Sequence, residues 1–127
     1  MKGTAMTETV AVENHTHGKQ VLQDIAPLSR SLRRAIPDVY AGFSELHKAA
    51  LAPGVLDTRT KELIALAIAV SEECDGCIAS HARGAARAGA TRQEVAEAIG
   101  VTILMSGGPG TVYGPRAYAA FEDFLED

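Results

Sequence analysis

The sequence predicts an all-α domain, and three observations lead to this expectation. Apolar residues recur at helical spacing along most of the 127 residues, and no stretch alternates apolar and polar residues as a strand does. Helix-start and helix-stop residues divide the chain into segments of ordinary helix length. Ala and Leu dominate the apolar residues and Trp is absent, which suits closely packed helices. We expect roughly five or six helices in one orthogonal or bundle-like domain.

The N-terminal segment is polar, and we expect a flexible arm over residues 1–19 before a helical domain over residues 20–127. The arm lacks the apolar centre of a signal peptide, and no stretch has the apolar length needed to span a bilayer. The net charge is -4 and no basic run occurs, which argues against nucleic-acid binding. We therefore expect a cytoplasmic protein with no membrane or nucleic-acid partner; Met1 and Met6 are both possible starts.

Two helices are expected before residue 54. The first has apolar residues at a loose helical period, with Pro27 as a break or the start of a second piece. Pro37 suits the first turn of the second helix, which Pro53 and Gly54 terminate. The apolar positions of these helices are Val21, Leu22, Ile25, Leu28 and Leu32, then Val39, Phe43, Leu46 and Ala50.

The central helices are predicted to be buried. Asp57 and Thr58 are good N-caps for a run over residues 62–70 that is apolar nearly all round, as in a helix covered on most sides. After a connection at residues 71–73, the next helix should begin at or near Cys74. Within this helix Gly84 allows close approach of a neighbour, and Gly89 is a plausible stop.

Two further helices follow. Thr91 and Glu94 form a capping box, which marks the start of a helix whose buried face carries Val95 and Ile99. Residues 106–110 are expected to be a loop; they lack the Lys-Ser/Thr of a phosphate-binding P-loop and follow no strand. The last helix is amphipathic.

The chemistry of the chain is concentrated in Cys74, Cys77 and His81, which occupy positions i, i+3 and i+7 of the predicted helix and so share one face. Cysteines near a helix N-terminus are favoured as thiolates by the helix dipole. His81 lies one turn after Cys77 and can take its proton, directly or through water. Cys74 can then close a disulfide with an oxidised Cys77.

Glu62 is the fourth candidate. If its helix and the helix of His81 form an antiparallel hairpin turning near residue 72, Glu62 lies ~15 Å before the turn and His81 ~13 Å after it. The two residues come out nearly level, so the carboxylate could orient the imidazole and raise its basicity. A carboxylate in an apolar run also needs a partner if it is buried.

These residues and their flanks resemble the signature of the AhpD-like alkylhydroperoxidases, which belong with the carboxymuconolactone decarboxylases in one all-helical superfamily. The resemblance covers about residues 35–125. Its motif is Glu62, then Cys74-x-x-Cys77, then His81, and its flanks are Leu56-Asp57-x-Arg59-Thr60-Lys61-Glu62-Leu63, Ala88-Gly89-Ala90-Thr91 with Glu94, and Gly107-Gly108-Pro109 with Tyr113.

The resemblance implies a thiol-based hydroperoxide reductase or disulfide oxidoreductase with an AhpD-like fold. Cys77 would attack the peroxide and become a sulfenic acid, and Cys74 would resolve it as an intramolecular disulfide. His81 would relay the proton, with Glu62 and a water behind it. Gly76 stands where the best-known member has a histidine, so one contributor to thiol reactivity is absent.

The resemblance also implies partners. No bound cofactor is expected, because the disulfide is itself the redox group and an external thiol or a protein-bound lipoyl group reduces it. A peroxiredoxin can be the oxidised partner. Family members are commonly trimers or hexamers. A homo-oligomer is independently expected, because a chain this small can hardly cover all its apolar helix surface.

Alternative interpretations remain at each residue. The cysteines could be small buried hydrophobes, His81 an exposed helix residue, and Glu62 a solvated first-turn acid. His47 is expected to be a surface or half-buried residue, and the tyrosines core or interface aromatics. Two other functions stay open. One is decarboxylation of a small lactone acid, for which Arg59, Arg83, Arg87 and Arg116 are the available cations. The other is a zinc site made by Cys74, Cys77, His81 and Glu62.

Overall fold

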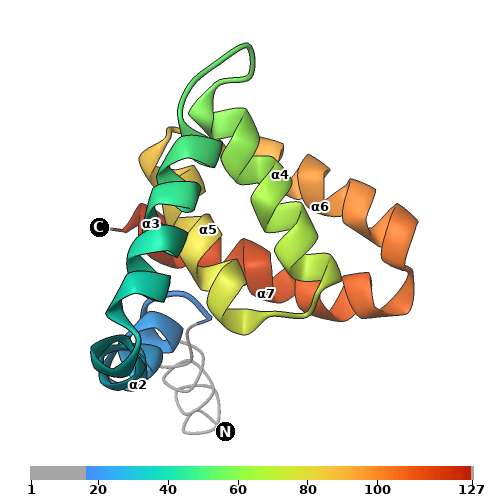
Figure 1. Ribbon diagram of the computed structural model, residues 1–127. Helices are drawn as coiled ribbons and strands as arrows, with labels where there is room; N and C mark the ends of the chain where they lie inside the picture. The colour runs from blue at the N-terminus through green and yellow to red at the C-terminus, as the bar shows by residue number, and fades with distance from the viewer. Residues whose placement is uncertain (1–16, 127) are drawn as a thin grey trace, which may run out of the picture.

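A computed structural model of the protein describes residues 17–126, and this part of the chain forms six α-helices and no strand (Figure 1). The all-α prediction is therefore confirmed. The expected arm over residues 1–19 lies almost wholly outside the described residues. None of the described helices is long and apolar enough to cross a membrane. The helices are α2 (Lys19–Ala35), α3 (Pro37–Leu51), α4 (Thr58–Ser71), α5 (Asp75–Arg87), α6 (Arg92–Ser106) and α7 (Gly108–Leu125).

Most helix ends lie where the capping residues predicted them. Asp57 is the N-cap of α4, and its carboxylate accepts a hydrogen bond of 2.8 Å from the amide of Thr60. Thr91 and Glu94 form the full capping box of α6. After α5 the chain turns at Gly89, whose φ of 86° lies in the left-handed region that favours glycine.

Two expectations about helix ends were wrong. Pro27 does not interrupt α2, which continues on both sides of it. The carbonyl of Gln23 loses its helical donor there, but this residue is exposed and water can replace the lost hydrogen bond. The loop expected over residues 106–110 is also shorter, because α7 already begins at Gly108 and Pro109 fits its first turn.

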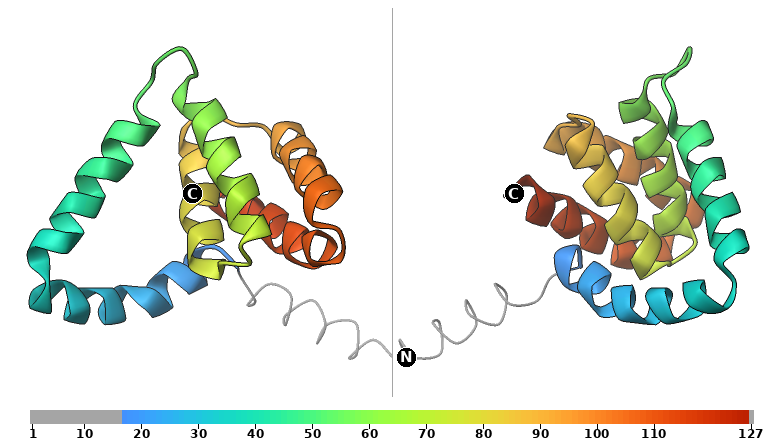
Figure 2. Two further views of the ribbon diagram at one scale, coloured as in Figure 1. Left: turned by 45° about the vertical axis from the view of Figure 1, so that its right-hand side comes forward. Right: turned by 60° about the vertical axis from the view of Figure 1, so that its left-hand side comes forward.

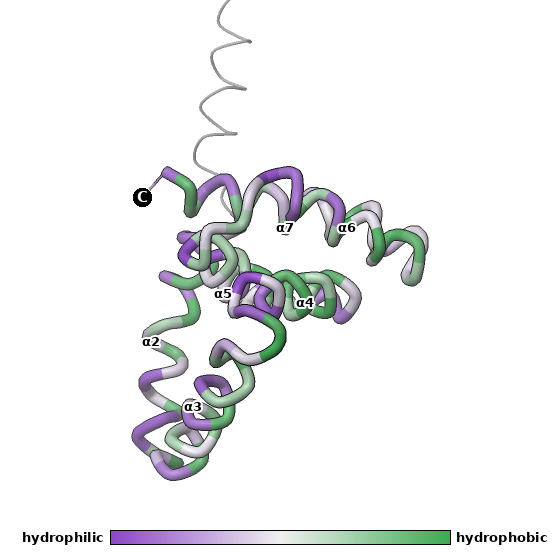
Figure 3. The backbone as a smooth tube through the Cα atoms, turned by 90° about the horizontal axis from the view of Figure 1, so that it is seen from above, coloured by the Kyte–Doolittle hydropathy of each residue, from purple (hydrophilic) through white to green (hydrophobic). Residues whose placement is uncertain are grey.

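The hydrophobic core lies among α4, α5, α6 and α7, which pack together in Figures 1 and 2. Figure 3 shows that α4 is hydrophobic along most of its length, as expected from its sequence. The largest side chains that are fully buried come from all four helices: Phe121, Leu66, Ile78, Val70 and Val95. Through this shared core, α6 and α7 pack against α4 and α5 and keep these two helices side by side.

Helices α2 and α3 lie at the edge of this core and contain no buried residue, although Leu22 of α2 packs against the core while half-buried (Figure 2). The end of α3 is held to α4 by hydrogen bonds from Thr58 Oγ1 to the Leu51 carbonyl (2.8 Å) and from Lys61 Nζ to the Ala52 carbonyl (2.6 Å). Both helices were predicted from their apolar periodicity, yet within one chain their apolar residues remain exposed: Ile25, Leu28, Leu32, Val39, Phe43 and Leu46.

Candidate active site

Glu62 and His81 meet across the α4–α5 hairpin. Nδ1 of His81 lies 2.7 Å from Oε1 of Glu62. The hairpin turns at Glu73, which adopts a left-handed φ of 57°, so the two helices run antiparallel and bring the two side chains level. The geometric prediction from residue counting is confirmed.

Glu62 is buried, with only 6% of the residue exposed. The interpretation of this residue as a solvated first-turn acid is therefore wrong. An ionised carboxylate removed from water needs a hydrogen-bond partner, and His81 supplies it. Gly84 supplies the space, because a β-carbon at this position would overlap the carboxylate of Glu62. The neighbour whose close approach was expected at Gly84 is thus the side chain of Glu62, one of the four candidate residues.

The hydrogen bond fixes how His81 can act. An ionised carboxylate only accepts hydrogen bonds, so a bond to ionised Glu62 requires the tautomer of His81 in which Nδ1 bears the hydrogen. Nε2 is then the basic nitrogen of the neutral ring, available to take a proton from another group. A carboxylate in this position could orient the imidazole and stabilise the charge that forms when the ring is protonated.

His47 is a neighbour that the sequence did not reveal. Its ring stacks on that of His81, with centroids 5.7 Å apart and planes 15° apart. His47 comes from α3 and is exposed, in line with its expected surface position, but nothing in the local pattern of α3 indicated this contact. It places α3 next to the hairpin that carries the candidate residues.

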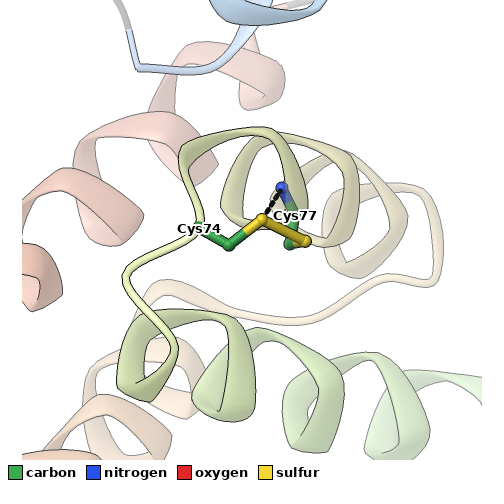
Figure 4. Close-up of a disulfide and its surroundings, with 2 residues drawn as sticks. All are labelled: Cys74 and Cys77. Atoms are coloured by element: carbon green, nitrogen blue, oxygen red, sulfur yellow. Dashed lines mark hydrogen bonds between the residues drawn. A yellow bond between two sulfur atoms is a disulfide. The ribbon is translucent and has the colours of Figure 1, made fainter.

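Cys74 and Cys77 form a disulfide at the start of α5 (Figure 4). Cys74 is the N-cap of the helix, and its sulfur accepts a hydrogen bond of 3.2 Å from the amide of Cys77. Cys77 is exposed and Cys74 is half-buried. The two cysteines are therefore not buried hydrophobes, and Cys77 is the more exposed residue of the two.

The disulfide and the Glu62–His81 pair are separate units. Over residues 17–126, no hydrogen bond joins the imidazole to either sulfur. They are related through α5, because His81 follows Cys77 by one helical turn on the same face. Proton transfer between Cys77 and His81 would therefore need a side-chain movement or one intervening water.

The acid beside the cysteines is partly neutralised. Asp75 accepts from Nη1 of Arg116 at 3.3 Å, and the guanidinium of Arg116 also lies 4.4 Å from the ring centroid of Tyr113. This exposed ion pair connects the first turn of α5 to α7 and places positive charge near the disulfide.

Asp57 begins the helix that carries Glu62, and its own ionisation is perturbed. Hydrogen bonds from the hydroxyl and the amide of Thr60 lower the pKa of Asp57. Partial removal from water raises the pKa, and the nearby charge of Arg59 lowers it. The ionised form is the better N-cap, because its oxygens accept from the unpaired amides of the first turn.

A pocket of about 280 Å³ opens beside the Glu62 carboxylate, and the sequence did not predict it. It is lined by α3, α4 and α5 through His47, Thr58, Glu62, Ser80, Arg83, Gly84, Arg87 and Ala88. Arg83 and Arg87 are one turn apart on α5, a spacing that could have indicated a shared cationic face.

In the described part of the chain, no three His, Cys, Asp or Glu side chains are grouped to hold a metal, so the four residues of the zinc alternative do not form one ligand set.

Comparison with known proteins identifies the family. The sequence profile of the carboxymuconolactone decarboxylase family matches residues 37–123, which include all four candidate residues. The chain belongs to the carboxymuconolactone decarboxylase family. Its AhpD-like helical fold agrees with this membership.

Two curated relatives carry no assigned activity. A Cupriavidus necator protein is 41% identical over 92 residues, which cover 72% of this chain and 81% of that protein. A protein from the cox locus of Paracoccus denitrificans is 39% identical over 90 residues, covering 71% of this chain and 81% of its own length. Both lie well within the range that indicates a shared family.

Solved structures of carboxymuconolactone decarboxylase family proteins share the fold. A Legionella pneumophila member in its apo form has a TM-score of 0.80 and 40% identity, covering 84% of this chain and 95% of that one. A Thermotoga maritima member, suggested to take part in an antioxidative response, has a TM-score of 0.71 and 28% identity, covering 85% and 92%.

Proposed function

We propose that this member of the carboxymuconolactone decarboxylase family is a thiol-based hydroperoxide reductase that works through Cys77 and Cys74. The observation that carries the proposal is a Cys74–Cys77 disulfide at a helix start, one turn before a histidine held by a buried carboxylate. The reduced pair of thiols supplies two electrons as it closes to the disulfide, and a neutral imidazole supplies the base that thiol chemistry needs.

The oxidative half of the cycle begins with both cysteines reduced. Nε2 of His81 takes the thiol proton of Cys77, and the thiolate attacks one peroxide oxygen. The O–O bond breaks, the alcohol leaves with a proton, and Cys77 becomes a sulfenic acid. Cys74 attacks its sulfur and water leaves, which forms the disulfide. Two thiols and one hydroperoxide thus give one disulfide, one alcohol and one water.

The reductive half needs an external dithiol, for which we propose a lipoyl-type group or another small dithiol. An oxidised peroxiredoxin belongs to the other half of the cycle, where its disulfide takes the place of the hydroperoxide and oxidises Cys74 and Cys77. Because Cys77 is the more exposed residue, the incoming thiolate attacks its sulfur. Cys74 then leaves as a thiolate, which the amide of Cys77 already solvates at 3.2 Å. A second thiol of the reductant releases Cys77, so the reductant is oxidised by two electrons. The cycle requires a thiol-rich compartment such as a cytoplasm.

The test is a thiol titration of reduced protein before and after one equivalent of cumene hydroperoxide, followed by dihydrolipoamide. We expect two thiols, then none, then two again. The Cys77→Ser variant should consume hydroperoxide no faster than buffer. If this variant matches the parent, or if the thiols of the parent persist after the hydroperoxide is added, the proposal is wrong.

Decarboxylation of a small lactone acid is a second candidate, and one observation favours it. The pocket beside Glu62 contains Arg83 and Arg87, which suit a carboxylate substrate. This chemistry does not need the cysteine pair. Turnover of a lactone acid by the Cys74→Ser/Cys77→Ser double variant would support this function. If the double variant no longer turned over the lactone acid, this function would be excluded.

A further inference from the structure

The two arginines of the pocket lack a counter-ion within the described chain. Ion pairs over residues 17–126 engage Arg59, Arg92 and Arg116, but neither Arg83 nor Arg87. Arg83 is half-buried and Arg87 is exposed, so the first is partly withdrawn from water that would otherwise screen it. Like charges one helical turn apart repel each other, and a bound anion would remove this repulsion.

The pocket is cationic although the chain as a whole carries a net charge of -4. The carboxylate of Glu62 also lines it, but Oε1 of that group is engaged by His81 at 2.7 Å. The remaining lining consists of the imidazole of His47, hydroxyls at Thr58 and Ser80, and the small residues Gly84 and Ala88. Guanidinium groups bind carboxylates through paired N–H donors, and the hydroxyl of Ser80 adds another polar group.

We propose that this pocket binds the carboxylate of the substrate, which makes an organic hydroperoxide carrying a carboxylate the preferred substrate class. The inference deepens the proposed function and rests on it. Helical rise places Arg83 about 9 Å and Arg87 about 15 Å along α5 from Cys77. An anion held between these arginines directs the other end of an elongated molecule past His81 towards the sulfur of the exposed residue Cys77.

A second hollow, of about 360 Å³, lies where Arg83 and Arg87 approach Phe124 and Leu125. We assign the anion to the first pocket because only that one is also lined by Glu62 and His47, which adjoin His81. The second hollow contains none of the four candidate catalytic residues.

The experiment compares two hydroperoxides that differ in one group: cumene hydroperoxide and its para-carboxylate. The parent should have a lower KM for the carboxylate form. In the Arg83→Gln/Arg87→Gln variant, KM for the carboxylate form should rise roughly tenfold or more, since charge-assisted hydrogen bonds are lost, with kcat and the neutral substrate little affected. The matched control is Arg30→Gln/Arg34→Gln, which removes two exposed arginines one turn apart on α2.

A second arm measures binding without turnover. Benzoate is titrated into disulfide-bonded protein and followed by amide chemical shifts, which should move around residues 80–88 in the parent but not in the Arg83→Gln/Arg87→Gln variant. Benzoate should also compete with the carboxylated hydroperoxide and not with the neutral one. That pattern means that the pocket holds the carboxylate of the substrate itself, and equal inhibition of both substrates would mean a separate anion effector and overturn the proposal.

The two arms separate the outcomes. If the neutral hydroperoxide is reduced but the carboxylate gives no advantage, the pocket proposal is wrong and the peroxidase proposal stands. If benzoate binds at residues 80–88 but no hydroperoxide is reduced, the peroxidase proposal fails, and with it the substrate class. An equal loss of preference in the α2 control would show that overall charge, rather than the pocket, attracts the anion, and would overturn the assignment.

Discussion

The carboxylate of Glu62 occupies the space that a β-carbon on Gly84 would fill. This contact joins α4 to α5 at the level of the Glu62–His81 hydrogen bond. A residue without a side chain on one helix therefore determines where the acid of the other helix can lie. The packing of the two helices and the Glu62–His81 hydrogen bond are therefore linked at this point of the structure.

Replacing Gly84 with alanine should destabilise the protein by about 1–3 kcal/mol, because the added methyl group overlaps a buried carboxylate in a packed site. Peroxide reduction should fall as well, since the carboxylate must move away from His81. Urea unfolding and hydroperoxide consumption measure the two effects.

Gly100→Ala is the matched control. Gly100 is a helical, exposed glycine on α6, and a β-carbon there meets nothing within 4 Å. This change should stabilise the protein by about 0.4–1 kcal/mol through the unfolded state. Equal effects of the two substitutions would show that the contact with Glu62 is not the cause.

His81→Gln should lower kcat/KM for hydroperoxide by about 10²–10⁴-fold, as expected when a general base is removed. Glu62→Gln should cause a smaller loss, since the amide oxygen still accepts from Nδ1 but no longer stabilises an imidazolium. Because Glu62 acts through His81, the double variant should be no slower than His81→Gln alone. Multiplied losses in this double-mutant cycle would mean that the two side chains act independently.

The two cysteines should differ as nucleophiles. With Cys74→Ser, the exposed Cys77 should react with a small aromatic disulfide faster than Cys74 does in the Cys77→Ser variant, because Cys74 is half-buried. Stopped-flow release of the aromatic thiol gives both rates. A faster Cys74 would reverse the roles of attacking and resolving cysteine.

Asp57 should contribute a pH-dependent part of the stability. Its pKa is lower in the folded chain because Thr60 donates hydrogen bonds to the ionised form. The stabilisation is therefore fully present above the unfolded-state pKa of about 3.9 and is lost as the pH falls through the lower folded-state value. Asp57→Asn keeps a capping oxygen and removes this titration. Urea unfolding from pH 6 down to pH 3 should show the two proteins converging, and a constant difference would contradict the assignment.

The exposed apolar faces of α2 and α3 predict self-association, as expected from the sequence. Leu28, Val39, Phe43 and Leu46 are each at least 63% exposed in one chain. Phe43→Glu should shift the sedimentation coefficient towards that of a monomer. Ser31→Glu adds the same charge at an exposed polar position of α2 and should not. A parent that sediments as a monomer at all concentrations would contradict this prediction.

The level positions of Glu62 and His81 could be predicted because they depend only on helical rise and one turn. The burial of Glu62 could not, since it depends on α5 presenting Gly84 at that point. The stack of His47 on His81 was missed for a similar reason. The stack depends on how α3 is oriented relative to α4 and α5. The sequence of α3 does not reveal this orientation, because α3 buries no residue.

The sequence by itself determined the helices, their caps and the shared face of Cys74, Cys77 and His81, because these follow from propensities and spacings within a few residues of each other. The tertiary structure decided which groups surround that face. The partner of His81, the space at Gly84 and the pocket with Arg83 and Arg87 all depend on side chains that approach from different helices, and only the packing of those helices brings them within reach.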